Sequence, residues 1–167
     1  MYGRLEQVDG RWRLQFSRAF GHSLEKVWRA LTEPEHLAAW FPTTVDGERT
    51  GGAALRFTFP GDEAPPFEGR MLTYDPPSVL EFSWGADVLR FELRPDGAGC
   101  LLTLTVTFDE QGRGARDGAG WHMSLDRLAA HLAGAEQDSE PDWAAVHALY
   151  VERLGPAAST IGPPEPH

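Results

Sequence analysis

The chain has 167 residues, a formal net charge of −10 and an apolar fraction of 41%. A length of this order suits one domain with a substantial core, and the composition is typical of a folded globular protein rather than a disordered one. Because the acidic sequence offers no dominant basic patch, we expect neither nucleic acid nor an anionic membrane as a partner.

The first residues are charged and lack the apolar stretch of a signal peptide, and no apolar run approaches the ~18 residues of a membrane-spanning helix. The single cysteine, Cys100, cannot form an intramolecular disulfide, which is compatible with a reducing compartment. We therefore expect a cytoplasmic protein without membrane insertion. Cys100 opens a predicted strand with no basic neighbour in sequence, so we interpret it as a buried structural thiol.

The N-terminal stretch predicts a β-hairpin. Apolar and polar residues alternate along residues 12–16, which is typical of a strand with one buried face. A turn at residues 8–10, Val-Asp-Gly, would join that strand to a short preceding one.

Two short helices are predicted next. Ser23 can cap the first, in which the apolar residues at positions 27, 30 and 31 share a face. Residues 32–35, Thr-Glu-Pro-Glu, match a capping box that would open the second helix, which extends through Trp40 and Phe41.

The middle of the chain predicts an antiparallel meander. Its alternating runs are separated by turns too short for the crossovers that parallel strands need. One face of each strand is apolar, and Gly69 lies among large residues on that face, where it would leave volume. The alternating apolar positions are Leu55, Phe57 and Phe59; Phe67 and Met71; Leu80, Phe82 and Trp84; Leu89, Phe91 and Leu93; and Leu102, Leu104, Val106 and Phe108.

A long helix is predicted over about 120–133 and a fourth helix over about 140–154. At about 100° per residue, the apolar residues 121, 125, 128 and 132 form one stripe that would face the sheet. Ser139 and Asp142 match a capping box before the fourth helix, whose apolar face we expect to dock on its own domain. Residues 155–167 are rich in Pro and Gly and predict a disordered tail.

This order of elements predicts an α+β fold of the helix-grip type, with a curved antiparallel sheet wrapped around a long C-terminal helix. Two short helices would follow the first long strand, and an extra helix would end the fold. We expect residues 1–154 to form a single domain.

The stretch GWHMSLDRLAAHL at 120–132 invites a search for a Ser-His-Asp group. Helical rotation places His122 and Asp126 on one flank and Ser124 about 160° or more away from both, so the serine cannot donate to the histidine. His122 and Asp126 also lack a third metal ligand, and the other histidines form no ligand pattern. We therefore expect no catalytic residue, no metal and no cofactor.

Five segments carry a family resemblance: HSLEKVWRALTEPEHLAAWFP (22–42), FEGRMLTYDPPSVLEFSW (67–84), LRFELRPDG (89–97), LLTLTVTFDE (101–110) and GWHMSLDRLAAHL (120–132). With them the chain resembles the bacterial START-like (SRPBCC, Bet v 1-type) proteins of the heat-shock-protein-90 ATPase activator-like group. The resemblance implies a cavity between the curved sheet and the long helix. It also places Trp40, Phe41 and Trp121 near that cavity.

Our leading hypothesis is a protein that binds an apolar or aromatic small molecule in this cavity. Strand alternation and the helical stripe add further inward-facing residues to those implied by the resemblance. Candidates for polar contacts are Thr43, Thr44, Glu68 and His122. The expected ligand-binding residues are Trp40, Phe41, Phe57, Phe67, Met71, Trp84, Phe91, Trp121 and Leu125.

Two alternatives belong to other functional classes. A cyclase-like or hydrolase-like enzyme would use the same cavity, but it needs an inward acid or base, and we identify no carboxylate with inward strand parity. A protein-interaction module would act as a homodimer or with a chaperone. In eukaryotic relatives the domain accompanies a larger binding domain that we do not find in this sequence, so a chaperone is not the expected partner.

Overall fold

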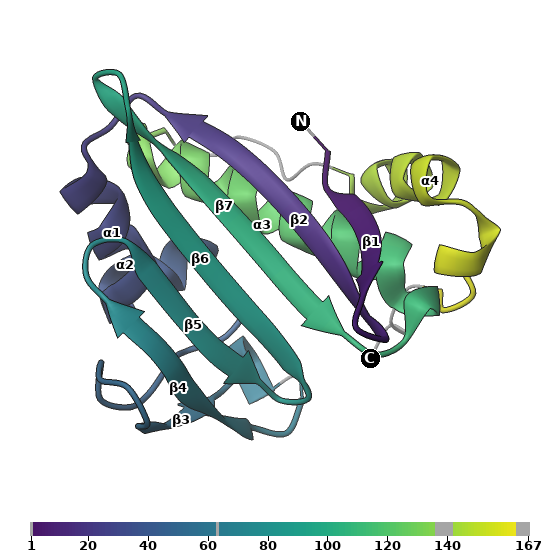
Figure 1. Ribbon diagram of the computed structural model, residues 1–167, viewed down its shortest axis with the longest axis horizontal. Helices are drawn as coiled ribbons and strands as arrows, with labels where there is room; N and C mark the ends of the chain where they lie inside the picture. The colour runs from purple at the N-terminus through teal and green to yellow at the C-terminus, as the bar shows by residue number, and fades with distance from the viewer. Residues whose placement is uncertain (1, 63, 136–141, 163–167) are drawn as a thin grey trace.

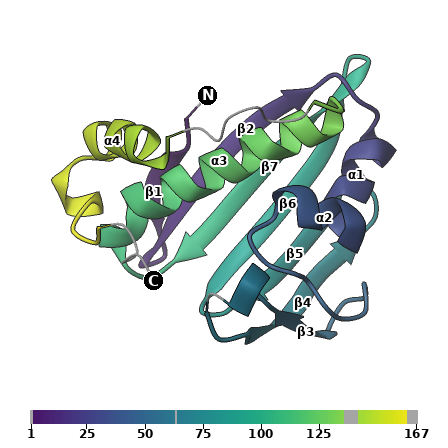
Figure 2. The ribbon, with the colours of Figure 1, turned by 180° about the vertical axis from the view of Figure 1, so that it is seen from behind.

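The computed structural model describes residues 2–62, 64–135 and 142–162. Seven strands form one antiparallel sheet in the order β1-β2-β7-β6-β5-β4-β3. The long helix α3 crosses one face of this sheet, and α1 and α2 cover the same face beside it (Figure 1 and Figure 2). The predicted α+β helix-grip architecture is therefore confirmed. The strands are β1 (Arg4–Val8), β2 (Arg11–Phe20), β3 (Ala54–Phe57), β4 (Phe67–Asp75), β5 (Val79–Trp84), β6 (Asp87–Asp96) and β7 (Gly99–Phe108).

The register of the sheet aligns the inward residues of neighbouring strands. Phe16 of β2 pairs with Leu104 of β7, Leu104 pairs with Phe91 of β6, and Phe91 pairs with Leu80 of β5. All four side chains are buried. This row of aligned side chains explains why period-two alternation of apolar residues predicts these strands. A shift of the strand register by one residue would turn every apolar side chain to solvent. The predicted hairpin is also present, with Asp9 and Gly10 both at positive φ in a two-residue turn between β1 and β2.

The four helices are α1 (Leu24–Thr32), α2 (Pro34–Trp40), α3 (Gly114–Leu132) and α4 (Trp143–Leu154). The Ser23 cap is confirmed, since its side chain accepts a hydrogen bond from the Lys26 amide at 3.2 Å. The capping box expected at 32–35 is wrong. Thr32 still belongs to α1 and donates to the Trp28 carbonyl, while α2 begins at Pro34, whose missing N–H suits the first helical position.

Helix α3 begins at Gly114, about six residues before the predicted start. Glycines at 114, 118 and 120 disguise its first turns in sequence, because glycine is a poor helix former. The predicted apolar stripe is confirmed: Trp121, Leu125, Leu128 and Leu132 are all buried. No helix within residues 2–62, 64–135 and 142–162 is long and apolar enough to cross a membrane.

Helix α4 docks on the flank of α3 through Tyr150, which is fully buried. The Tyr150 hydroxyl accepts from the Gly3 amide at 2.9 Å and lies 2.9 Å from Nδ1 of His122. Arg18 also approaches this nitrogen, at 3.3 Å, and an arginine can only donate, so Nδ1 is the acceptor and Tyr150 donates to it. Burial lowers the pKa of His122, which keeps the ring in this neutral state. The predicted docking of the fourth helix on its own domain is confirmed.

The two ends of α4 differ from expectation. Asp142 caps the helix by accepting from the Ala144 amide at 3.1 Å, whereas Ser139 lies outside the described residues. The disordered tail predicted from residue 155 is wrong for 155–162. Residues Pro156–Ala158 form a 3-10 turn, Ala158 is buried, and the Ile161 amide donates to the Gly112 carbonyl at 3.1 Å. Small residues let this segment pack closely against the start of α3.

Gly69 does not leave open volume as expected. A Cβ atom placed there would collide with the backbone carbonyl of Ser83 on β5 and with the ring of Phe57. The glycine instead permits a close approach of β4 to β5, two residues before the register shift that lies between Met71 and Thr73.

Two glycines two residues apart on α3 give a test of the α4 docking. A Cβ at Gly118 would lie 2.8 Å from the Tyr150 ring, whereas a Cβ at Gly120 meets nothing within 4 Å. We expect Gly118→Ala to lower the free energy of unfolding by about 1–3 kcal/mol through overpacking. Gly120→Ala should raise it by about 0.5–1 kcal/mol through helix propensity. Urea unfolding of both variants checks this, and equal effects would contradict the docking.

Candidate ligand-binding site

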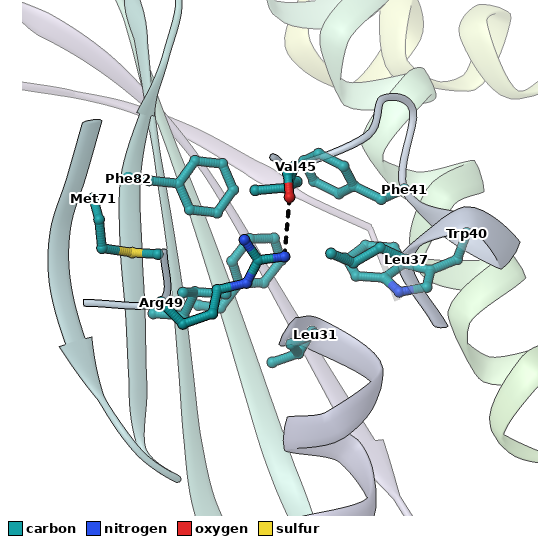
Figure 3. A pocket seen from close by; sticks show the side chains of 10 residues that line it. Leu31, Leu37, Trp40, Phe41, Val45, Arg49, Met71 and Phe82 are labelled. Carbon is teal, nitrogen blue, oxygen red and sulfur yellow. Dashed lines mark hydrogen bonds between the residues drawn. The ribbon is translucent and has the colours of Figure 1, made fainter. Parts of the chain in front are cut away.

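An enclosed void lies between the sheet and the helices α1 and α2 (Figure 3). Its volume is about 10 Å³, which is room for about one water molecule. Four predicted ligand-binding residues line it, namely Trp40, Phe41, Met71 and Phe91. They come together as predicted, but their own side chains fill the space, and no residue of α3 lines it. This void is therefore not the cavity bordered by the long helix that the resemblance implies.

Arg49 closes the void on one side. Its Nε, Nη1 and Nη2 atoms donate to the carbonyl oxygens of Thr32, Gly47 and Val45 at 3.0, 2.9 and 3.0 Å. Figure 3 shows the guanidinium among the apolar residues, with its bond to Val45 drawn. Burial lowers the pKa of Arg49. The three carbonyl dipoles hold the cation in a largely apolar setting.

A much larger space is a groove beside α3, with a volume of about 510 Å³. This volume falls in the range of small-molecule sites, ~300–1,000 Å³. Its walls come from the ends of β5 and β6, the groove-facing flank of α3, the loop at Pro42 and the start of α4. The lining residues are Pro42, Phe59, Trp84, Asp87, Arg113, Arg116, Asp117, Gly120, Trp121, Met123, Ser124, Arg127 and Trp143.

Aromatic rings form the apolar part of the groove. Trp84 and Trp121 meet edge to face, with ring centroids 5.3 Å apart, and Phe41 lies behind both, at 6.0 and 5.7 Å. The Trp84 Nε1–H donates to the buried Thr43 hydroxyl at 3.2 Å, which fixes the orientation of the indole. Trp143 from α4 forms the far wall and stacks on His147, with centroids 4.6 Å apart.

An ion-pair network forms the polar part of the groove. Arg113 donates to Asp87 from Nη2 at 2.6 Å and from Nη1 at 3.3 Å, and to Asp117 from Nη2 at 2.7 Å and from Nε at 3.0 Å. Burial disfavours the charge on Arg113, but the two carboxylates more than offset this and raise its pKa above the usual range. Burial also raises the pKa of Asp87, against the opposing effect of Arg113. The network ties β6 to the start of α3.

Asp87 lines the groove but was not among the site residues expected from the sequence, although a signal was present. It precedes Leu89 and Phe91 with the same strand parity, and it is only 7% exposed. The statement that no carboxylate has inward parity was therefore wrong. Arg113 could not be found in the same way, because its partner Asp87 lies 26 residues away and the pairing depends on tertiary structure.

The predicted site residues divide between these places. Trp84 and Trp121 line the groove, whereas Phe57 and Phe67 pack on each other, with centroids 5.1 Å apart, and line neither the groove nor the void. Leu125 is buried in the stripe of α3 and lines neither space.

The four residues predicted for polar contacts with a ligand also lie in different places. Thr43 supports Trp84, and Thr44 accepts from the Thr58 amide and donates to Asp46. Glu68 is exposed on the outer face of β4, and His122 belongs to the α4 contact. Of these, Thr43 alone bonds to a groove residue within the described chain.

Phe41 lies between the enclosed void and the hollows at the surface. It lines the void and also a hollow of about 310 Å³ at the surface, which shares Phe59 with the groove. The same ring contacts both groove tryptophans. Together with Leu37 and Val45, which also line both the void and this hollow, Phe41 divides the interior from the surface.

The geometry excludes the serine-histidine pair considered from the sequence. His122 contacts Tyr150, Arg18 and Asp126, the last at 3.5 Å, and Ser124 lies on the groove side of α3. Among residues 2–62, 64–135 and 142–162, no three His, Cys, Asp or Glu side chains gather as a metal site. Cys100 is buried, as predicted, and burial raises the pKa of its thiol.

The sequence of this chain matches one known protein family. Residues 22–133 match the family model described as Activator of Hsp90 ATPase homolog 1-like protein. No curated protein matches the chain by sequence.

Solved structures of the same fold include a conserved protein of unknown function from Enterococcus faecalis, at 22% identity and a TM-score of 0.79 over 91% of this chain and 90% of that one. CalU16 from Micromonospora echinospora is 22% identical, with a TM-score of 0.72 over 95% of each chain. A Bordetella parapertussis protein is 24% identical, with a TM-score of 0.67 over 91% of this chain and 88% of that one. At these identities the likeness concerns the fold.

Phe41→Ala tests whether the interior is closed by this one ring. We expect the substitution to cost about 3–5 kcal/mol of stability and to open a dry apolar space that binds benzene. Benzene should then raise the melting temperature of the variant by more than that of the unaltered protein. Equal stabilisation of both proteins by benzene would show that removal of the Phe41 ring opens no new binding space.

Proposed function

The chain belongs to the family of Activator of Hsp90 ATPase homolog 1-like proteins, and we propose that it binds an apolar, aromatic small molecule in the groove beside α3. The observation that carries this proposal is the gathering of Trp84, Trp121 and Trp143 around a space of about 510 Å³. Rigid indole rings offer a large apolar area at a low cost in side-chain entropy, which favours flat, apolar ligands.

The site differs from the one expected from sequence. A ligand in the enclosed void would have to displace Phe41 and its neighbours, whereas the groove is open without any rearrangement. Burial of ligand surface against the three tryptophans would supply the binding energy, at ~25 cal/mol per Å² before the costs of ordering.

One observation favours acid–base chemistry as a second candidate. Asp87 is a buried carboxyl at the wall of the groove, and burial raises its pKa, as is common for catalytic carboxyls. Both of its oxygens, however, accept hydrogen bonds from Arg113. This pairing occupies one acceptor site on each oxygen and orients the carboxylate toward the guanidinium, so we assign Asp87 to positioning Arg113.

The interaction-module hypothesis receives less support. The large apolar side chains that are exposed in the described ranges are Leu72 on β4 and Leu149 and Val151 on α4. They lie on two separate elements rather than in the contiguous patch that marks a protein interface.

The neutral fluorophore N-phenyl-1-naphthylamine tests the proposed site. We expect it to bind with a tryptophan-dependent fluorescence increase, and Trp143→Ala should weaken binding about tenfold, which corresponds to ~1.4 kcal/mol. Trp143 is the groove tryptophan contributed by the docked helix, so its removal leaves the stripe of α3 in place.

Leu149→Ala is the matched control, because it removes an exposed apolar side chain from the same helix without touching the groove. Equal loss of affinity in the two variants would mean that the dye responds to α4 as a whole. Unchanged affinity in Trp143→Ala would place the site elsewhere.

A further inference from the structure

We propose that the ligand of the groove is an amphiphilic anion, with an aromatic body against the tryptophans and an acidic group beside Arg116. This inference rests on the proposed function and adds the charge of the ligand. Carboxylates, sulfonates and phosphates share the chemistry that is required. The juxtaposition of the indole rings with arginine side chains in one groove carries the inference.

The groove is richer in basic side chains than the protein as a whole. Three arginines and two aspartates line it, while the whole chain has a net charge of −10. An acidic protein that places arginines in an aromatic groove creates a local attraction for anions there and repels them over the rest of its surface.

Arg113 already has its counterions. Four of its hydrogen bonds go to Asp87 and Asp117, at 2.6–3.3 Å, and they hold Arg113 rigidly at the edge of the site. The nitrogens of Arg113 are thus engaged within the protein, and the acidic group of a ligand would bind at Arg116 instead.

Arg116 has the donors that a ligand could use. Its Nε lies 3.3 Å from Asp117 Oδ1, and the two terminal nitrogens make no hydrogen bond to the protein within residues 2–62, 64–135 and 142–162. The side chain is 29% exposed and lines the groove. A planar guanidinium with two unused terminal nitrogens binds a carboxylate, sulfonate or phosphate through parallel hydrogen bonds.

A neutral ligand would fit this groove less well. It would cover Arg116 and remove water from its terminal nitrogens without replacing the lost hydrogen bonds, which opposes binding. An acidic group replaces them and compensates the charge. The two chemistries of the groove, aromatic and cationic, therefore select one class of ligand.

A matched pair of dyes tests this inference on the full chain. 1-Anilinonaphthalene-8-sulfonate has the ring system of N-phenyl-1-naphthylamine with an added sulfonate. We expect the sulfonate to tighten binding at least tenfold at low salt and this advantage to shrink as salt rises, because salt screens the ion pair. Arg116→Gln should abolish the advantage by weakening binding of the sulfonate dye, and it should not weaken binding of the neutral dye.

Arg94→Gln is the control, since Arg94 is exposed on β6 away from the groove and its loss changes the net charge equally. Equal affinity of the two dyes, or an equal loss of preference in both variants, would overturn the inference while binding of the neutral dye still supports the proposed groove. Failure of both dyes to bind would overturn the inference together with the proposed function.

Discussion

The packing of one apolar stripe of α3 against the sheet determines where every other feature of the molecule lies. Trp121, Leu125, Leu128 and Leu132 are buried along this stripe. Because successive side chains are rotated by about 100°, fixing the stripe fixes both flanks of the helix. One flank presents Gly118 and His122 to α4, and the opposite flank presents Arg116, Gly120 and Ser124 to the groove. The helix thus separates a structural contact from a binding surface.

The sheet beneath α1 and α2 serves packing rather than binding. Its inward aromatic residues interlock at centroid distances of 5–6.5 Å, as in the contacts of Phe82 with Phe57 and Phe91. Buried indole N–H groups find acceptors, since Trp40 donates to the Ala30 carbonyl at 2.8 Å. An interior filled in this way leaves about 10 Å³. The groove beside α3, in contrast, combines a volume of about 510 Å³ with exposed aromatic area and charged groups.

Much of the fold could be predicted because its signals are local. Period-two alternation follows directly from one buried sheet face, and the stripe of α3 follows from helical rotation. The exclusion of a Ser124–His122 pair rested on the same rotation. The errors arose at glycines, where a tertiary contact rather than local preference determines the residue. Gly118 makes room for Tyr150, but glycine is a poor helix former, so the first turns of α3 were not predicted. Gly69 marks a close approach of two strands rather than free volume.

The binding site was less predictable for a physical reason. Inward parity identifies which side chains face the interior, but not whether they leave space, because packing depends on shape in three dimensions. Trp84 and Trp121 were therefore predicted together with Phe57 and Leu125, although only the first two line the groove. Arg113 and Asp87 come from distant parts of the sequence, and neither one alone indicates the network that they form.

The indole N–H resonances of the six tryptophans test the central claim most directly. Trp84, Trp121 and Trp143 line the groove, whereas Trp12 and Trp28 do not, and Trp40 lines the enclosed void. In a titration with N-phenyl-1-naphthylamine followed by NMR, the account predicts that the three groove resonances shift together while the other three stay in place. A shift of Trp40 with the groove resonances unmoved would contradict it and return the ligand to the interior.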